Sequence, residues 1–283
     1  MAEILMKGAP VANALTEQLA SRTEALKAKG VVPTLAIVRV GENDSDLSYE
    51  RGALKRCEKV GVEVKMFVLP ADCTQAQLEE TIKTVNEDAS IHGCLMFRPL
   101  PKTIDERAVC ELLDPAKDVD CITSGSLCSV FTGKGSGFAP CTAQSCIEIL
   151  DYYGVKLQGA RVAVIGRSLV IGKPVSMMLQ QRNATVTMCH TKTVDMPAVC
   201  KEAEVLVVAA GKAGVVTPDY TNADQYIIDV GINVNEEGKL CGDVAFDAVE
   251  PGVKAISPVP GGVGSVTTAV LCKHVVEAAE KSV

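Results

Sequence analysis

The segment Arg161-Val162-Ala163-Val164-Ile165-Gly166-Arg167-Ser168-Leu169-Val170-Ile171-Gly172-Lys173-Pro174 joins a strand, a turn and the start of a helix. Its opening run of apolar and β-branched residues predicts a buried strand. Pro174 suits the first turn of a helix, where its missing N–H costs nothing. This order aims backbone N–H groups and the positive end of a helix at a pyrophosphate, as in dinucleotide-binding folds. Ser168 replaces the middle glycine of the usual pattern, so an ordinary strand–turn–helix remains an alternative.

The end of the next predicted strand bears on the choice of dinucleotide. Folds that prefer NAD usually place an acidic residue there to hold the ribose 2′-hydroxyl. In this chain Cys189 is followed by His190-Thr191-Lys192, without an acid. A hydroxyl and a cation, with Arg167 as a further donor, suit a 2′-phosphate. The sequence therefore favours NADP, with NAD as the alternative, although His190 and Lys192 also fit an ordinary solvated loop.

Apolar runs alternate with amphipathic stretches along the whole chain, which predicts the α/β class with mostly parallel sheets covered by helices. The predicted strands are Thr34–Val40, Val62–Leu69, Gly93–Phe97, Arg161–Ile165, Thr185–Cys189, Val205–Ala209, Tyr226–Val230 and Val253–Ser257. The predicted helices are Val11–Lys29, Leu47–Val60, Thr74–Asp88, Asp105–Leu113, Cys141–Tyr153, Pro174–Arg182, Pro197–Ala203 and Thr267–Lys281.

Length and glycine content divide this pattern into two domains. The chain has 283 residues, which suits two domains better than one. Ser124–Ala139 is rich in Gly and Ser and lacks periodicity, so it is the expected boundary. A second hinge, Ser257–Gly264, precedes a last helix that has no following strand. We expect that helix to return to the first domain, giving residues 1–139 plus 268–283 and a doubly wound, Rossmann-like domain at 140–267.

Composition excludes several classes of function. The net charge of −7 disfavours binding to nucleic acid, which needs clustered Lys and Arg. No apolar run reaches the roughly 20 residues of a membrane-spanning helix, and the N-terminus lacks the order of a signal peptide. The twelve cysteines contain no Cys-x-x-Cys and there are only three histidines. We therefore expect a cytoplasmic protein with reduced thiols and no metal site.

Seven segments, in this order, resemble the methylenetetrahydrofolate dehydrogenase/methenyltetrahydrofolate cyclohydrolase family. The similarity spans nearly the whole chain. The segments are Lys117-Asp118-Val119-Asp120, Pro140-Cys141-Thr142, Gly166–Pro174, Ala184–His190, Asp229-Val230-Gly231-Ile232-Asn233, Gly242-Asp243-Val244 and Pro258–Gly264.

The resemblance implies a homodimer that binds tetrahydrofolate derivatives and transfers hydride between them and NADP. It assigns Tyr49 and Asp120 to the catalytic site, with Tyr49 stacked near the pterin and Asp120 bound to its amino-pyrimidine edge. The implied substrate-binding residues are Tyr49, Met96, Phe97, Arg98, Asp120, Pro260, Gly261, Gly262, Val263 and Gly264. The implied cofactor-binding residues are Gly166, Arg167, Ser168, Gly172, His190, Thr191, Gly211, Ile232 and Thr267.

The chain departs from this family at two positions that serve hydrolysis of the methenyl product. Family members with that activity carry Tyr-x-x-x-Lys and Val-Gln-Leu-Pro-Leu-Pro. Here Ala53 stands at the lysine position and Phe97 at the glutamine position. Lys55 would face another side of the helix, since residues advance by roughly 100° each. Arg56 and Arg98 are poor proton carriers because an arginine stays protonated.

These departures predict a dehydrogenase of one-carbon metabolism with weak or absent cyclohydrolase activity, working alongside a separate cyclohydrolase. Three alternatives stay open. The chain could be bifunctional despite the substitutions, its substrate could have drifted away from folate, or it could be a catalytically silent subunit that binds folate or nucleotide.

Overall fold

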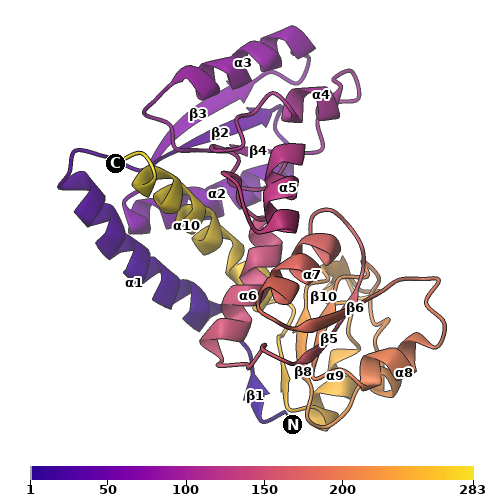
Figure 1. Cartoon of the computed structure of the whole chain (residues 1–283). Coiled ribbons are helices and arrows are strands. Elements are labelled where there is room, and N and C mark those ends of the chain that lie inside the picture. The colour runs from indigo at the N-terminus through magenta and orange to yellow at the C-terminus, as the bar shows by residue number, and fades with distance from the viewer. Residues whose placement is uncertain (1) are drawn as a thin grey trace. The chain divides into compact units, whose positions relative to one another are not determined.

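The computed structural model describes residues 2–283, and the chain divides into two compact units. One comprises the chain up to Ala12 together with Thr142–Thr267, and we call it the six-stranded unit after its sheet. The other, the three-stranded unit, comprises Asn13–Cys141 and Thr268–Val283. Both units have parallel sheets with helices around them, which confirms the predicted α/β class (Figure 1). Among residues 2–283, no helix has both the length and the apolar content needed to cross a lipid bilayer.

The six-stranded unit has the strand order β1-β11-β8-β7-β5-β6, and every neighbouring pair is parallel. Its strands are β1 (Ile4–Leu5), β5 (Arg161–Ile165), β6 (Thr185–Cys189), β7 (Val205–Val208), β8 (Tyr226–Asp229) and β11 (Ala255–Ile256). Two further short strands, β9 (Asn233–Val234) and β10 (Leu240–Cys241), form an antiparallel hairpin. The helices of this unit are α6 (Cys141–Tyr152), α7 (Gly172–Gln181), α8 (Met196–Lys201) and α9 (Phe246–Val249).

The core of the six-stranded unit follows from the alternation of side chains along its strands. Ala163 and Ile165 of β5 pack with Cys200 of α8 and Val249 of α9, in one hydrophobic cluster. Helix α7 packs on β5 and β6 and buries Val175 and Leu179. Right-handed crossovers on opposite faces of a parallel sheet produce this doubly wound arrangement.

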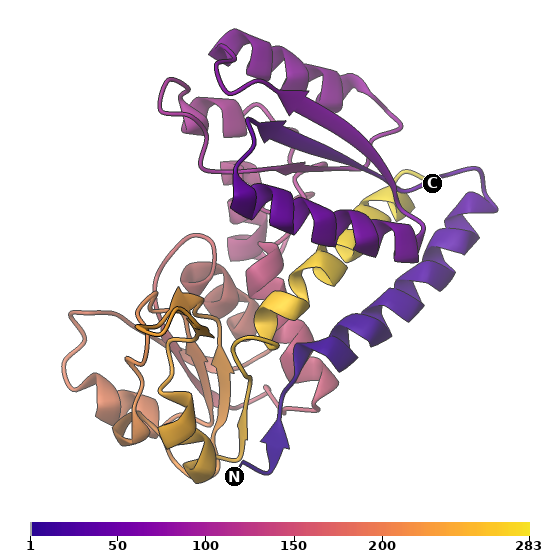
Figure 2. The ribbon, with the colours of Figure 1, turned by 180° about the vertical axis from the view of Figure 1, so that it is seen from behind.

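The three-stranded unit has the order β3-β2-β4, again all parallel. Its strands are β2 (Thr34–Val40), β3 (Glu63–Leu69) and β4 (Gly93–Met96). Its helices are α2 (Asp44–Val60), α3 (Gln75–Glu87), α4 (Glu106–Cys110), α5 (Ser124–Thr132), nearly all of α10 (Thr267–Glu280) and the larger part of α1 (Gly8–Lys27). Figure 2 shows α3 along one side of this sheet, with α2 and α10 along the other.

Alternation along β2 explains how both faces of this small sheet are covered. Ala36 and Val38 pack in a cluster with Leu78 and Ile82 of α3. The next residue, Arg39, points to the opposite face, where it contacts Glu50 of α2. The central strand is therefore buried on both sides, which is why it carries an almost unbroken apolar run.

The structure corrects two expectations. Ser124–Ala139 is not an irregular boundary throughout, because α5 occupies Ser124–Thr132. Thr123 caps that helix by accepting the Ser126 N–H, and Ser126 is buried. At the N-terminus, β1 pairs with β11, so the first residues belong with the six-stranded unit and not with the unit that follows them in sequence.

Candidate functional site

The turn after β5 is closed by two glycines in contact with neighbouring backbone. Gly166 has φ +123°, and a Cβ there would lie 2.2 Å from the carbonyl oxygen of Ala209. A Cβ on Gly172 would lie 2.2 Å from the carbonyl oxygen of Gly166. Any larger side chain at either position would open the turn. The glycines therefore hold β5, the end of β7 and the start of α7 close together.

Ser168, at the middle position of the motif, stabilises this turn. Its Oγ accepts the N–H of Ile171 at 3.1 Å, and its carbonyl accepts the N–H of Lys173 at 3.0 Å. Ile171 supplies no side-chain cap to α7. The exposed residues of the turn, Arg167 and Ser168 among them, surround the N-terminal end of α7, where the helix dipole favours an anion.

The chain that follows β6 lies beside this turn, since the Gly166 N–H donates to the Cys189 carbonyl at 2.9 Å. His190 is half-buried, and its Nδ1 accepts the N–H of Lys192 at 3.1 Å. Thr191 and Lys192 are exposed. The imidazole thus shapes the turn, while the hydroxyl and the ammonium remain accessible to a ligand.

Two buried aspartates hold the loops after β7 and β8. Asp243 accepts the N–H groups of Ala210, Gly211 and Lys212 and the side-chain amide of Asn233. Because a carboxylate is a strong acceptor, this arrangement fixes the backbone around Gly211. A Cβ on residue 231 would lie 2.2 Å from the Asp243 carboxyl carbon, which explains why this residue is Gly231.

Asp229 completes this framework from the end of β8. It accepts the N–H groups of Gly231, Asp243 and Val244. Burial raises the pKa of Asp229 to about 6, against these three hydrogen bonds, which lower it. A Cβ on Gly242 would lie 1.9 Å from its carboxylate oxygen. The Asp-Val-Gly and Gly-Asp-Val motifs are therefore two halves of one scaffold, a role that the motifs alone did not reveal.

A cavity of about 240 Å³ is bordered by residues 229–232 of this scaffold, by Leu240 and by residues 258–265, which include the last family segment. Ile232 is 68% exposed at its edge. Pro260, Gly261 and Gly264 are exposed, whereas Gly262 and Val263 are buried. Thr267 is buried, and its hydroxyl donates to the Gly264 carbonyl at 3.3 Å. The structure thus brings the predicted residues Ile232 and Pro260–Gly264 together.

In the three-stranded unit, the segment Lys117–Asp120 separates into supporting and accessible residues. The Lys117 ammonium donates to the carbonyls of Val85, Asn86 and Asp88, and so caps the C-terminal end of α3. Asp118 is fully buried and accepts two backbone N–H groups, one on each carboxylate oxygen. Both residues serve the scaffold.

Asp120 is half-buried and accepts the backbone N–H of Cys141 at 2.9 Å. Burial raises its pKa, while the Cys141 N–H and the positive charge of Arg98 lower it. Arg98 lies 4.0 Å from the Glu106 carboxylate. Asp120 is therefore the acid of this segment that a ligand can reach, with an arginine near enough to influence its charge.

The substituted positions lie on α2 and at the end of β4. Tyr49 and Phe97 are half-buried and meet edge to face, with ring centroids 6.0 Å apart and planes at 82°. Ala53, one turn after Tyr49, has no exposed surface. Met96 is 4% exposed and packs in the core with α3. The side chain at position 53 is therefore enclosed by packing, and the ring of Phe97 faces that of Tyr49.

Comparison with known proteins assigns the family. Residues 6–120 match the catalytic domain, and residues 140–283 the NAD(P)-binding domain, of the tetrahydrofolate dehydrogenase/cyclohydrolase family. The chain belongs to this family. Membership makes it an oxidoreductase of one-carbon folate metabolism with a Rossmann-like NAD(P)-binding domain, as the sequence motifs predicted.

The relatives support this assignment over the full length of the chain. It is 52% identical to the "Bifunctional protein FolD" of Carboxydothermus hydrogenoformans over 282 residues, 99% of this chain and 98% of the relative. The Campylobacter jejuni FolD structure superposes with a TM-score of 0.94, at 35% identity and 99% coverage of both chains. The Trypanosoma brucei FolD, solved with NADP and an inhibitor, gives a TM-score of 0.91 at 31% identity, covering 100% of this chain and 99% of its own.

Proposed function

We propose that the chain interconverts 5,10-methylenetetrahydrofolate and 5,10-methenyltetrahydrofolate by hydride transfer with NADP, and that it hydrolyses the methenyl product weakly or not at all. The observation that carries the second part is Ala53, a fully buried methyl group at the position of the family lysine. The first part is supported by the match to both domains of the family.

The residues of the six-stranded unit fit a bound NADP. The turn from Gly166 to Gly172 and the N-terminal end of α7, which lacks a side-chain cap, suit a pyrophosphate. Thr191, Lys192 and Arg167 offer a hydroxyl and two cations to a 2′-phosphate, and no acid follows β6 to favour NAD. The Trypanosoma brucei relative is described as a complex with NADP, which agrees with this preference.

Hydride transfer makes few chemical demands on the protein. The methylene carbon loses a hydride and the two neighbouring nitrogens stabilise the resulting cation, so no side chain needs to move a proton. NADP, when bound, accepts that hydride. The protein contributes position: Asp120 accepts N–H groups of the pterin edge, and the ring of Tyr49 forms a wall beside it. Holding two reactants in the right geometry supplies most of such a barrier reduction.

Hydrolysis of the methenyl group is different, because a water must be activated and protons must move. A tuned acid or base contributes roughly 10²–10⁴-fold to a step of this kind. The side chains of Ala53 and Phe97 can neither donate nor accept such a proton, and a guanidinium such as that of Arg98 is a poor proton carrier. The alternative is a bifunctional enzyme, which the names of the relatives favour. If hydrolysis is lost, a separate cyclohydrolase must consume the methenyl product.

The assignment predicts a preference between the dinucleotides. With methylenetetrahydrofolate as substrate, the initial rate should be higher with NADP than with NAD. Lys192→Met should lower kcat/KM for NADP by roughly 10-fold, the value of one charge-assisted hydrogen bond, and leave kcat/KM for NAD nearly unchanged. Absence of reduction with either dinucleotide would favour a catalytically silent subunit or a different substrate.

Loss of hydrolysis is tested with methenyltetrahydrofolate and the purified protein. The absorbance of methenyltetrahydrofolate should decay no faster with the protein than in buffer alone. Since position 53 is closed by packing, a lysine there needs room, so we expect gain of hydrolysis in the pair Ala53→Lys with Phe97→Gln. The matched control, Ala53→Met with Phe97→Gln, adds similar bulk without an ammonium and should stay inactive. Rapid decay with the unmodified protein would contradict the proposal.

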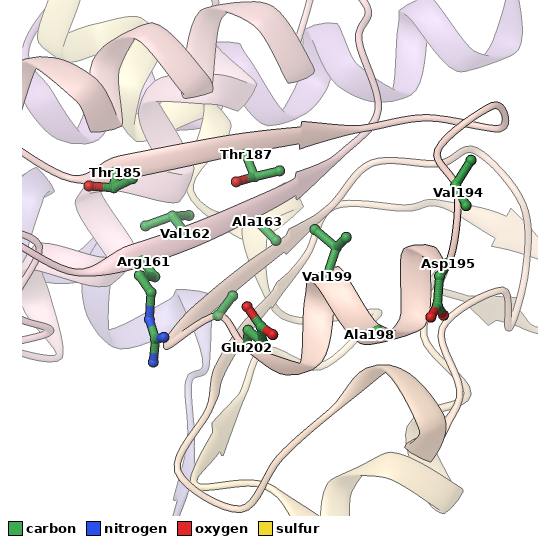
Figure 3. A pocket seen from close by; sticks show the side chains of 11 residues that line it. Arg161, Val162, Ala163, Thr185, Thr187, Val194, Asp195, Ala198, Val199 and Glu202 are labelled. Carbon is green, nitrogen blue, oxygen red and sulfur yellow. The ribbon is translucent and has the colours of Figure 1, made fainter.

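We also propose a homodimer, supported by the open edge of β6. This strand ends the six-stranded sheet, and within residues 2–283 its pairing partner is β5 alone. A groove of about 370 Å³ is lined by side chains of β5, β6 and α8, and Figure 3 shows these side chains with Val194 at one end. Val194 is 88% exposed. An unprotected edge strand beside an apolar side chain is a surface that proteins usually cover. Sedimentation velocity should give a dimer; a monomer at micromolar concentration would rule it out.

The thiols support the proposal of a reducing compartment such as the cytoplasm. All twelve cysteines are present as thiols and not as disulfides, and ten of them are fully or nearly buried, among them Cys57, Cys94 and Cys272. Within residues 2–283 no group of three His, Cys, Asp or Glu side chains is arranged to hold a metal ion. The cysteines therefore act as small apolar side chains.

A further inference from the structure

The central strand of the three-stranded unit carries a buried arginine near its end. Arg39 is 6% exposed, and its Nε lies 2.9 Å from Oε2 of Glu50, which is 9% exposed. Its Nη1 donates to the carbonyl of Gly41, in the turn that leads from β2 to α2. Removing two charges from water is costly unless their mutual attraction and further hydrogen bonds offset it. Such a pair needs an explanation beyond ordinary core packing.

Glu50 sits where it can set the rotation of α2. It shares the buried face of this helix with Ala53 and Cys57, as expected for residues three and four positions apart. Tyr49 precedes it directly and lies at the border of that face, half-buried. Fixing the Glu50 carboxylate therefore fixes the direction in which the Tyr49 ring leaves the helix.

Phe97, whose ring faces that of Tyr49, lies in a segment that pairs with β2, the strand that carries Arg39. The N–H of Phe97 donates to the carbonyl of Val38 at 3.0 Å, continuing the pairing of β2 with β4. Two consecutive residues of β2, Val38 and Arg39, thus anchor the two segments that carry Phe97 and Tyr49. The two rings meet edge to face, with their planes at 82°, between segments that are both attached to β2.

We infer that Arg39 and Glu50 are a positioning pair, which holds Tyr49 against Phe97 and so sets the shape of the aromatic wall that receives the pterin. This inference rests on the proposed function. Both are positioning residues and not catalytic ones, because the guanidinium is occupied by the Glu50 carboxylate and the Gly41 carbonyl. The pair acts on substrate binding through the orientation of Tyr49.

The test compares four variants of the full-length protein: Arg39→Met, Glu50→Gln, both changes together, and Arg39→Lys. Arg39→Met and Glu50→Gln each leave one charge of the buried pair without its partner and should destabilise the fold. The double variant removes both charges of the pair and should fold. We expect its KM for methylenetetrahydrofolate to rise roughly 10-fold, because small misplacements of positioning groups are costly, while its KM for NADP stays unchanged. Arg39→Lys keeps a positive charge beside Glu50, so its KM for methylenetetrahydrofolate should rise less than that of the double variant.

The control variant is Lys65→Met, which removes a half-exposed ion pair with Asp88 in the same unit and should leave both KM values unchanged. A folded double variant with an unaltered KM for methylenetetrahydrofolate would overturn the inference. Equal increases in KM for methylenetetrahydrofolate and for NADP would also overturn it, because they would indicate a general structural effect. If the unmodified protein and the Lys65→Met control were both inactive, the proposed function would fail instead.

Discussion

The contact between Gly166 and the carbonyl of Ala209 is the constraint on which the nucleotide side of this protein depends. A side chain at position 166 would collide with the Ala209 carbonyl, so the backbone that follows β5 contacts the backbone that follows β7 directly. The first residue of α7, Gly172, contacts the Gly166 carbonyl in the same way. Asp243 then holds that loop by accepting three consecutive N–H groups. A rigid, anion-attracting surface results from close backbone packing and a buried carboxylate, with few side chains needed at the ligand itself.

Strands that are buried on both faces could be predicted from the sequence. β2 and β5 occupy the predicted residues and are almost entirely buried, which is why each carries a continuous apolar, β-branched run. β6 also occupies its predicted residues, as an edge strand whose side chains are partly exposed. Helix α5 was missed because its residues are mostly hydroxyl-bearing or glycine, and its stability comes from the Thr123 cap and burial of Ser126. β1 is two residues long and exists through pairing with β11, a partner some 250 positions away that no local pattern shows.

Residue roles were harder to predict than positions. Asp118 and Asp120 are equivalent by residue type, yet one has both oxygens committed to backbone N–H groups and the other is accessible. Lys117 likewise caps the C-terminal end of α3, and its ammonium is occupied by backbone carbonyls. The sequence did indicate Ala53 and Phe97 as departures from the family pattern, and the structure adds that the Ala53 side chain is fully buried. Arg39 and Glu50 gave no local signal, because their pairing requires α2 to fold back on β2.

The proposal that this chain transfers hydride but hydrolyses the methenyl product weakly or not at all rests on the fully buried Ala53. Product stoichiometry tests this most directly. Methylenetetrahydrofolate and NADP are incubated with the enzyme, and NADPH, methenyl- and formyltetrahydrofolate are measured at early times against an enzyme-free blank. One methenyl group should accumulate for each NADPH formed. Formation of NADPH with formyltetrahydrofolate in equal amount, and without methenyl accumulation, would contradict the account.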